Sequence, residues 1–201
     1  RRRNLREAKH IYNQMKEFMK NDLHLGTGLL SMFAKCGAID EAQNIFEELR
    51  DRDAISWNAL MGGFTRCGHG ESALRCFWQM QEQGILPNVV TFLCVLQACG
   101  IVKCIELGKR LHAELEEEGL FRKQILLGTT LVDMYAKCGM LETSKRVFEE
   151  LPEQNVVSWS ALIAGYVEHG HSDEALECFM QMQNKGITPN SITFHCVLKA
   201  C

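Results

Sequence analysis

Apolar residues recur along this chain in pairs of short segments, each with the three- and four-residue spacing of one helix face. In one pair the first segment carries Trp57, Leu60, Met61 and Phe64, and the second carries Ala73, Leu74, Phe77 and Met80. A glycine follows each segment, at Gly68 and at Gly84 shortly before Pro87, and glycine is typical of a helix end. The pattern therefore predicts two helices joined by a tight turn within residues 54–88.

A shorter pair of segments shows the same design. Its apolar positions are Leu30, Phe33 and Ala34, followed by Ala42, Ile45 and Phe46. Gly37 separates the two segments, so the sequence Ala-Lys-Cys-Gly at residues 34–37 is interpreted as the last turn of a helix and its glycine stop. The same four residues recur at 136–139, 102 positions later.

The whole chain repeats with this period. Residues 54–88 and 156–190 are identical at 18 of 35 aligned positions, and four cysteine pairs coincide under the same shift, at 36/138, 76/178, 94/196 and 99/201. Because 31, 35 and 36 residues add up to one period, the predicted units are 1–22, 23–53, 54–88, 89–124, 125–155, 156–190 and 191–201. One hairpin cannot bury its apolar face alone, so we expect an all-α protein, a right-handed α-solenoid of helix-turn-helix repeats.

Composition excludes several classes of protein. The net charge of −3 argues against nucleic-acid binding by bulk electrostatics alone, although a sparse basic line on one edge stays compatible with it. No apolar run reaches the roughly 18–20 residues of a membrane helix, so no membrane partner is expected. No two of the ten cysteines have the two-residue spacing that zinc sites favour, which predicts reduced core thiols, no metal and no cofactor.

One short motif resembles a catalytic site. His112-Ala113-Glu114 matches the H-x-E of zinc deaminases, but the P-C-x-x-C that would complete the zinc shell is missing. The repeat also places His112 inside a second helix. The segment is therefore predicted not to be an enzyme.

Two helices in about 35 residues also describe tetratricopeptide repeats, which bind proteins. Trp57, Leu60 and Phe64 fit that pattern, but Met61 stands where its glycine belongs. A protein-binding α-solenoid scaffold stays open as the alternative function.

The units resemble the pentatricopeptide repeat family, in the plant organelle subclass that alternates P-, L- and S-type motifs. "VVSWSALIAGYVEHGHSDEALECFMQMQNKGITPN" resembles a P motif, and "ILLGTTLVDMYAKCGMLETSKRVFEELPEQN" an S motif. Residues 89–124, which begin "VVTFLCVLQACG", resemble an L motif. The resemblance makes 1–22 the second half of an L-type repeat, 23–53 and 125–155 S-type, 54–88 and 156–190 P-type, 89–124 L-type, and 191–201 the start of another L-type repeat.

The resemblance implies a single-stranded RNA binder that reads one base per repeat and takes part in C-to-U editing or RNA processing in a chloroplast or mitochondrion. Accessory organellar editing proteins would contact the L-type repeats. The fifth and last residues of each motif would meet the Watson–Crick edge of the base. These pairs are Thr27 with Asp53, Asn58 with Asn88, Thr129 with Asn155, and Ser160 with Asn190.

In the family's code these pairs give G, then C or U, a gap, A, A and a second gap. The gaps fall on the L-type repeats, where Leu93 pairs with Gln124 and where His195 stands at the fifth position. Apolar second positions would sandwich each base, and they are Ile55, Val90, Leu126, Val157 and Ile192, with His24 breaking the run. At the thirteenth position Lys35, Arg66 and Lys137 would lie near phosphates, whereas Glu168 departs from the pattern.

Both ends of the sequence fall within an L-type motif, as in a slice of a longer array. Such a slice would expose apolar stacking faces, so we expect end-to-end dimers at high concentration.

Overall fold

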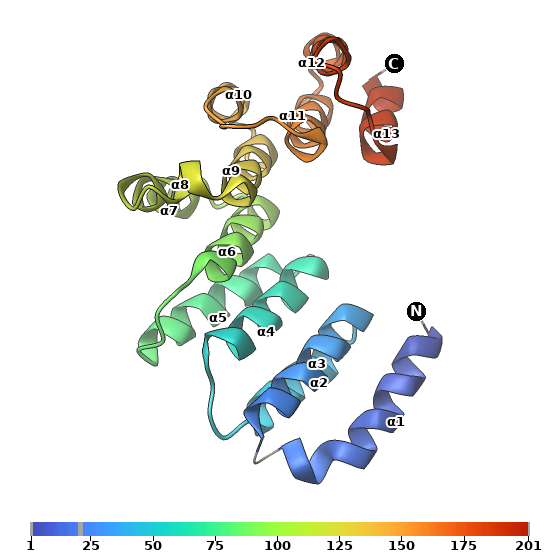
Figure 1. The fold of residues 1–201 in the computed structure, drawn as a ribbon, viewed down its shortest axis with the longest axis vertical. Helices are drawn as coiled ribbons and strands as arrows, with labels where there is room; N and C mark the ends of the chain where they lie inside the picture. The colour runs from blue at the N-terminus through green and yellow to red at the C-terminus, as the bar shows by residue number, and fades with distance from the viewer. Residues whose placement is uncertain (1, 20–21, 201) are drawn as a thin grey trace. The chain divides into compact units, whose positions relative to one another are not determined.

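The computed structural model describes residues 2–19 and 22–200, which form helices and turns without a strand (Figure 1). The helices are α1 (Arg2–Met19), α2 (Leu23–Cys36), α3 (Ile39–Glu48), α4 (Ala54–Arg66), α5 (Gly70–Glu82), α6 (Val89–Val102), α7 (Ile105–Glu117), α8 (Leu120–Lys123), α9 (Ile125–Lys137), α10 (Leu141–Glu149), α11 (Val156–Glu168), α12 (Ser172–Asn184) and α13 (Ser191–Ala200). The predicted all-α fold is confirmed. Within these residues, none of the helices combines the length and apolar character that a membrane span requires.

The chain divides into two compact units, residues 1–98 and residues 99–201. In the first unit α2 packs with α3, α4 packs with α5, and α2 lies against α4. In the second unit α9 packs with α10, α11 packs with α12, and α11 contacts both α9 and α13. Within each unit the first helices of successive hairpins therefore form one layer.

The two helix layers differ in length. Among the complete hairpins, the first helices have 13 or 14 residues, as in α2 and α4, α9 and α11. The second helices range from 9 residues in α10 to 13 residues in α5 and α12. The difference in length between the predicted 31-residue and 35-residue units thus falls in the second helix and the turn after it.

A buried tryptophan joins consecutive hairpins. The ring of Trp57 in α4 meets Phe46 of α3 edge-on, with centroids 4.5 Å apart. Trp159 of α11 meets Phe148 of α10 in the same way at 4.6 Å. Both indoles are almost fully buried, and such aromatic pairs add about 0.5–1.5 kcal/mol beyond the apolar area they bury.

The repeated Ala-Lys-Cys-Gly segments are glycine-capped helix ends. Gly37 and Gly139 have φ angles of 78° and 77°, in the left-handed region where a side chain is disfavoured. At the first site the N–H of Ala38 donates to the carbonyl of Phe33 at 3.0 Å, a pattern that closes a helix C-terminus.

The cysteines within the described residues are unpaired thiols of the helix packing. Nine of them fall within the described residues, and all nine are free. Burial raises the pKa of the Cys76 and Cys99 thiols to about 12, so these groups stay protonated at neutral pH. They act as small apolar side chains.

The short helix α8 was not expected, because the pattern predicted two helices for residues 89–124. Gly119, with a φ of 64°, ends α7, and the chain then makes one further helical turn. Phe121 in this turn is buried and packs edge-on against the His112 ring at 5.5 Å between centroids. Four residues are too few to show a helical period, so packing of Phe121 defines this element.

Glycines in the first helices allow close approach between hairpins. A Cβ atom at Gly165 of α11 would lie 2.5 Å from Cβ and 3.3 Å from Cα of Ala136 in α9. Gly63 of α4 faces Ala34 of α2 in the same way, with 2.9 Å to the Cβ of Ala34. The packing of neighbouring first helices therefore depends on small residues at both sides of the contact.

The substitution Gly165→Ala is expected to destabilise the protein by about 1–3 kcal/mol, because the new methyl group would overlap Ala136, and relief requires a backbone shift. Urea unfolding of the variant and the wild type measures the difference.

Gly62→Ala is the matched control. A Cβ there would lie 3.8 Å from Cys94 Sγ, an ordinary contact, and the equivalent residue of the second period is Ala164. This variant should be neutral or up to about 1 kcal/mol more stable, through higher helix propensity. Equal unfolding midpoints for Gly62→Ala and Gly165→Ala would contradict the close approach.

Candidate nucleic-acid interface

The last residue of each predicted reading pair is the N-cap of the following first helix. Asp53 Oδ1 accepts from Ser56 N at 2.8 Å at the start of α4. Asn155 Oδ1 accepts from Val157 N at 2.9 Å and from Ser158 N at 3.1 Å at the start of α11. These bonds satisfy N–H groups that the helix itself leaves unpaired. The cap leaves the second polar atom, Nδ2 of Asn155 or Oδ2 of Asp53, outside the helix start.

Asn88 and Asn190 cap α6 and α13 in the same way. Asn88 Oδ1 accepts from Val90 N at 3.0 Å and from Thr91 N at 3.1 Å. Asn190 Oδ1 accepts from Thr193 N at 2.9 Å.

The structure brings two of the four predicted pairs together. Asn58 Nδ2 donates directly to Asn88 Oδ1 at 3.0 Å. Ser160 reaches Asn190 through the Thr193 hydroxyl, which lies 2.7 Å from Ser160 Oγ and donates to Asn190 Oδ1 at 3.0 Å. Both pairs belong to the 35-residue units.

The other two pairs have no such link among the described residues. The hydroxyl oxygens of Thr27 and Thr129 are buried and have no hydrogen-bond partner there. An unsatisfied buried hydroxyl costs about 1–3 kcal/mol. The fifth-position side chains of the 31-residue units are therefore polar groups without a partner within the described part of the chain.

Residues 89–124, the unit with no predicted base, are followed by a helix that starts without a side-chain cap. Gln124 precedes α9 but makes no side-chain cap bond in the described structure. The side-chain cap that accompanies each predicted reading pair is thus missing at residues 89–124, whereas Asp22, the last residue of the L-type unit 1–22, does cap α2.

Exposed apolar side chains stand next to the caps. The five predicted sandwich residues are 50–59% exposed, namely Ile55, Val90, Leu126, Val157 and Ile192. Branched aliphatic residues are normally among the most buried, so their exposure at the same repeat position is a recurring feature of the first helices in each unit. His24 is also exposed at the equivalent position of α2.

The three predicted phosphate contacts lie in the last turns of first helices. Lys35 and Arg66 are exposed at the ends of α2 and α4. Lys137 ends α9, where its Nζ atom forms an ion pair with Asp133 Oδ2 at 2.7 Å. Part of the positive charge of Lys137 is therefore neutralised within its own helix.

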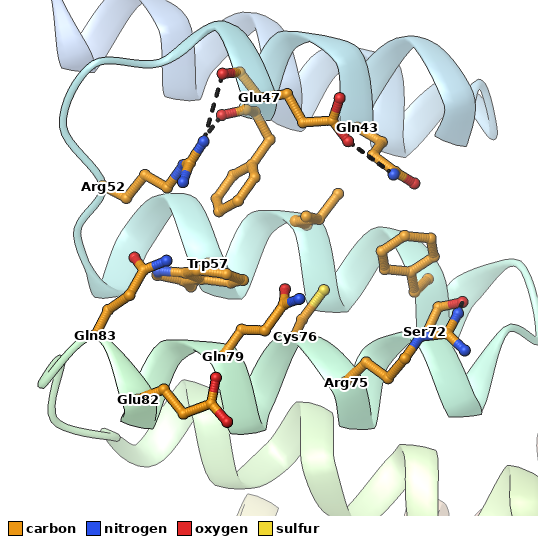
Figure 2. A pocket seen from close by; sticks show the side chains of 13 residues that line it. Gln43, Glu47, Arg52, Trp57, Ser72, Arg75, Cys76, Gln79, Glu82 and Gln83 are labelled. Carbon is orange, nitrogen blue, oxygen red and sulfur yellow. Dashed lines mark hydrogen bonds between the residues drawn. The ribbon is translucent and has the colours of Figure 1, made fainter.

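A hollow of about 520 Å³ lies between α3, α4 and α5 (Figure 2). Its lining residues are Gln43, Phe46, Glu47, Arg52, Trp57, Leu60, Phe64, Ser72, Arg75, Cys76, Gln79, Glu82 and Gln83. In Figure 2, Arg52 reaches back to α3, where it donates to the backbone carbonyl of Phe46 at 3.3 Å. None of the predicted reading, apolar or cationic residues lines this hollow, which makes it a separate feature.

His112 is a residue of the helix core. It is buried in α7, and its Nδ1 atom lies 3.0 Å from the Tyr135 hydroxyl of α9. Burial lowers the pKa of His112, which favours the neutral ring. The described residues contain no group of His, Cys, Asp and Glu that could hold a metal ion.

Two sets of repeat models match this sequence. The PPR repeat family model matches residues 52–100 and 154–201, and the PPR repeat model matches residues 27–53 and 129–156. The chain belongs to the pentatricopeptide repeat (PPR) family. This match confirms the family resemblance, while the division into P-, L- and S-type motifs stays a prediction.

Curated relatives from Arabidopsis thaliana include a pentatricopeptide repeat-containing protein described as chloroplastic, 35% identical over 198 residues, which are 98% of this chain and 32% of the relative. Another, described as mitochondrial, is 37% identical over 187 residues, which are 93% of this chain and 29% of the relative. This PPR chain spans about a third of the length of these two relatives.

Solved structures share the fold. The PPR protein PPR10 from maize matches 88% of this chain and 31% of its own, with a TM-score of 0.59 and 22% identity. The PPR domain of Arabidopsis thaliana protein-only RNase P 1 matches 85% of this chain and 94% of its own, with a TM-score of 0.59 and 14% identity.

The cap at Asn155 predicts how substitutions affect stability. Asn155→Ala should lower stability by about 1 kcal/mol, because Ser158 N loses its acceptor. Asn155→Asp should preserve stability, because Asp53 caps α4 through the same atom. Thermal unfolding of the two variants tests this expectation, and a loss as large in Asn155→Asp as in Asn155→Ala would contradict the capping role.

The neutral ring of His112 predicts a pH dependence. Because the folded state lowers the pKa of His112 below its ordinary value of 6.5, the unfolded chain binds more protons just below that value. The contribution of His112 to stability is thus fully present above about pH 6.5 and is lost as the pH falls through the folded pKa.

His112→Gln, which cannot titrate, should show a smaller drop in urea midpoint than the wild type between about pH 7.5 and about pH 5.5. The difference between the two proteins isolates His112 from the other histidines. Identical pH dependence would show that His112 is not held neutral.

Proposed function

We propose that this PPR chain binds single-stranded RNA in a sequence-specific manner, with one base per reading pair. The observation that carries the proposal is the shared capping geometry of Asp53, Asn88, Asn155 and Asn190. One side-chain oxygen of each residue is bound to the helix start, and an exposed apolar side chain stands two residues later. The same polar and apolar groups therefore recur in both compact units.

The cap supports a physical basis for reading purines. Asn155 uses Oδ1 in the cap, so Nδ2 with its two protons is the atom left for a ligand. Those protons match N1 of adenine, which is an acceptor. Asp53 also uses Oδ1, and its other oxygen only accepts, which matches the N1–H of guanine.

The reading pairs give an order of bases along the chain. Asp53 with Thr27 is assigned G, and Asn88 with Asn58 is assigned C or U. Asn155 with Thr129 and Asn190 with Ser160 are each assigned A. A one-base gap at residues 89–124 separates the second and third assignments, and residues 191–201 begin a further gap.

The apolar and basic positions would supply affinity that does not depend on sequence. Apolar side chains such as Ile55 and Val157 offer van der Waals contact to the faces of neighbouring bases. Lys35 and Arg66 offer exposed charges to phosphates. Such a sparse basic edge is compatible with a chain whose net charge is −3.

The wider role follows from the family. We assign the chain to the recognition part of an organellar C-to-U editing or RNA-processing factor of the subclass with P-, L- and S-type motifs, acting in a chloroplast or mitochondrion. Relatives described as chloroplastic and mitochondrial support the compartment. The PPR domain of protein-only RNase P 1 was solved in complex with tRNA, which supports RNA as the ligand class. Accessory editing proteins at the L-type repeats remain part of this proposal.

Binding to short RNAs that carry G-Y-N-A-A, with Y a pyrimidine, tests the function. Wild type should prefer this RNA over versions with one changed base by about tenfold, the effect of one mismatched hydrogen bond. Asn155→Asp should shift the preference at the first A toward G, and Asp53→Asn should shift the G slot toward A. Titration of fluorescent RNAs measures each affinity at fixed salt.

The two variants control for each other, because each should change only its own slot. Equal affinity of the wild type for all RNAs in the panel would overturn the base assignments. A preference that disappears between moderate and high salt for every RNA alike would indicate binding by charge alone.

A further inference from the structure

Thr91 links the two reading residues of the preceding repeat. Its hydroxyl is fully buried, although the residue belongs to the next first helix, α6. Thr91 Oγ1 accepts from Asn88 N at 3.1 Å and donates to Asn58 Oδ1 at 2.8 Å. A hydroxyl has only one proton to donate, so the short bond to Asn58 uses it.

This network permits only one orientation of the Asn58 amide. Asn88 Oδ1 must be an oxygen, because it accepts the backbone N–H groups of Val90 and Thr91. One polar atom of the Asn58 amide lies 3.0 Å from Asn88 Oδ1. That atom has to be the donor Nδ2, because Asn88 Oδ1 is an acceptor. The reversed amide would set two carbonyl oxygens against each other and would leave the Thr91 proton without its short acceptor.

Asn88 Oδ1 is turned to the backbone N–H groups of α6, and Asn58 Oδ1, although it keeps a second lone pair, is turned to the buried Thr91 hydroxyl. What remains for a ligand is one proton of Asn58 Nδ2 and two protons of Asn88 Nδ2, which are all donors. Cytosine presents acceptors at N3 and O2 on its Watson–Crick edge, whereas uracil presents a donor at N3. A pair that turns donors toward the ligand fits cytosine and opposes the N3–H of uracil.

We propose that Thr91 is a positioning residue that fixes the Asn58 amide and so selects cytidine over uridine at the slot of residues 54–88. The inference rests on the proposed RNA-binding function and narrows one of its slots. It assigns specificity to a side chain that lies outside the repeat whose base it selects.

The other repeats show that this link is particular and not a general property of helix starts. Ser158 occupies the equivalent place in α11, but its hydroxyl donates to the backbone carbonyl of Asn155 at 3.0 Å. Ser56 does the same with the carbonyl of Asp53 at 2.9 Å. Thr193, at the equivalent place in α13, contacts Ser160, the fifth-position residue of the preceding repeat. Threonine therefore stands at this position of the helix that follows each predicted 35-residue unit.

The test compares Thr91→Val with Thr91→Ser in the full chain. Each variant is titrated with two single-stranded RNAs that differ only in C or U at this slot. Wild type should bind the C form about tenfold more tightly, which is the effect of one opposed hydrogen bond. Thr91→Val should reduce this ratio to near one, because the Asn58 amide, without its bond to Thr91, can swing away from Asn88 and offer its oxygen to the N3–H of uracil. Thr91→Ser should retain the ratio.

Ser158→Ala is the matched control for the capping function. It removes the hydroxyl that bonds to the backbone N and O of Asn155, and among the described residues that hydroxyl makes no hydrogen bond to the fifth-position residue Thr129. It should leave the C-to-U ratio at the Thr91 slot unchanged. Thermal unfolding of all variants is recorded beside the binding data.

Three results would overturn the proposal. The first is an equal loss of affinity for the C and U forms in Thr91→Val, which would show a structural role alone. The second is a wild type that discriminates A from G at the Asn155 slot but does not discriminate C from U at the slot of Asn58 and Asn88. In that case the proposed RNA-binding function would stand, but the role of Thr91 would be wrong. A wild type that binds no RNA of the panel above a scrambled RNA would instead remove the proposed function itself.

A measurement on the wild type covers the case of a Thr91→Val variant that does not fold. The two Asn58 Nδ2 protons should exchange with solvent at unequal rates in NMR, because one is bonded to Asn88 Oδ1. Equal, fast exchange of both protons is the third result that would overturn the proposal.

Discussion

The start of every first helix leaves backbone N–H groups that the helix cannot pair, and this constraint organises the rest of the PPR chain. At α4, α6, α11 and α13 an Asp or Asn oxygen meets it. The hydrogen bond from the backbone N–H to this side-chain oxygen fixes the side chain. It therefore also decides which polar atom of the capping residue stays outside the helix. Helix initiation and the chemistry offered to a ligand are thus set by the same hydrogen bond.

Packing holds these helix starts at a fixed spacing within each unit. Gly63 against Ala34, and Gly165 against Ala136, let adjacent first helices approach closely. The buried indoles of Trp57 and Trp159 then join each hairpin to the one before it. The apolar side chains at the second helical position cannot enter this packing, because they lie on another face of the same helices. Their exposure follows from the geometry of the stack.

Much of the fold could be predicted from periodicity. The buried faces around Trp57 and Phe33, the glycine stops at Gly37 and Gly68, and the all-α class all follow from local spacing. The turn of α8 could not be predicted, since four residues carry no period. The ion pair between Lys137 and Asp133 has a visible signal in the sequence, because residues four apart on a helix are neighbours.

The candidate site was less accessible to sequence reasoning. Spacing alone does not pair Asn58 with Asn88, whereas the family resemblance does. These two residues are 30 positions apart in the sequence, and a 3.0 Å hydrogen bond joins them in the structure. The sequence does not single out Thr91, because a hydroxyl three residues after Asn88 is typical of a helix cap. The capping-box spacing was a usable signal for Thr91 and Thr193, but only coordinates show that their hydroxyls turn toward the preceding repeat.

The near-constant length of the first helices, set against the variable second helices, bears on how such arrays diverge. Residues can be gained or lost in the second helix, as between α10 and α12, while α9 and α11 keep the same 13 residues. Insertions and deletions that persist through descent should therefore collect in the second helices and their turns. The distance between the starts of successive first helices would then stay constant, while the second helices change in length.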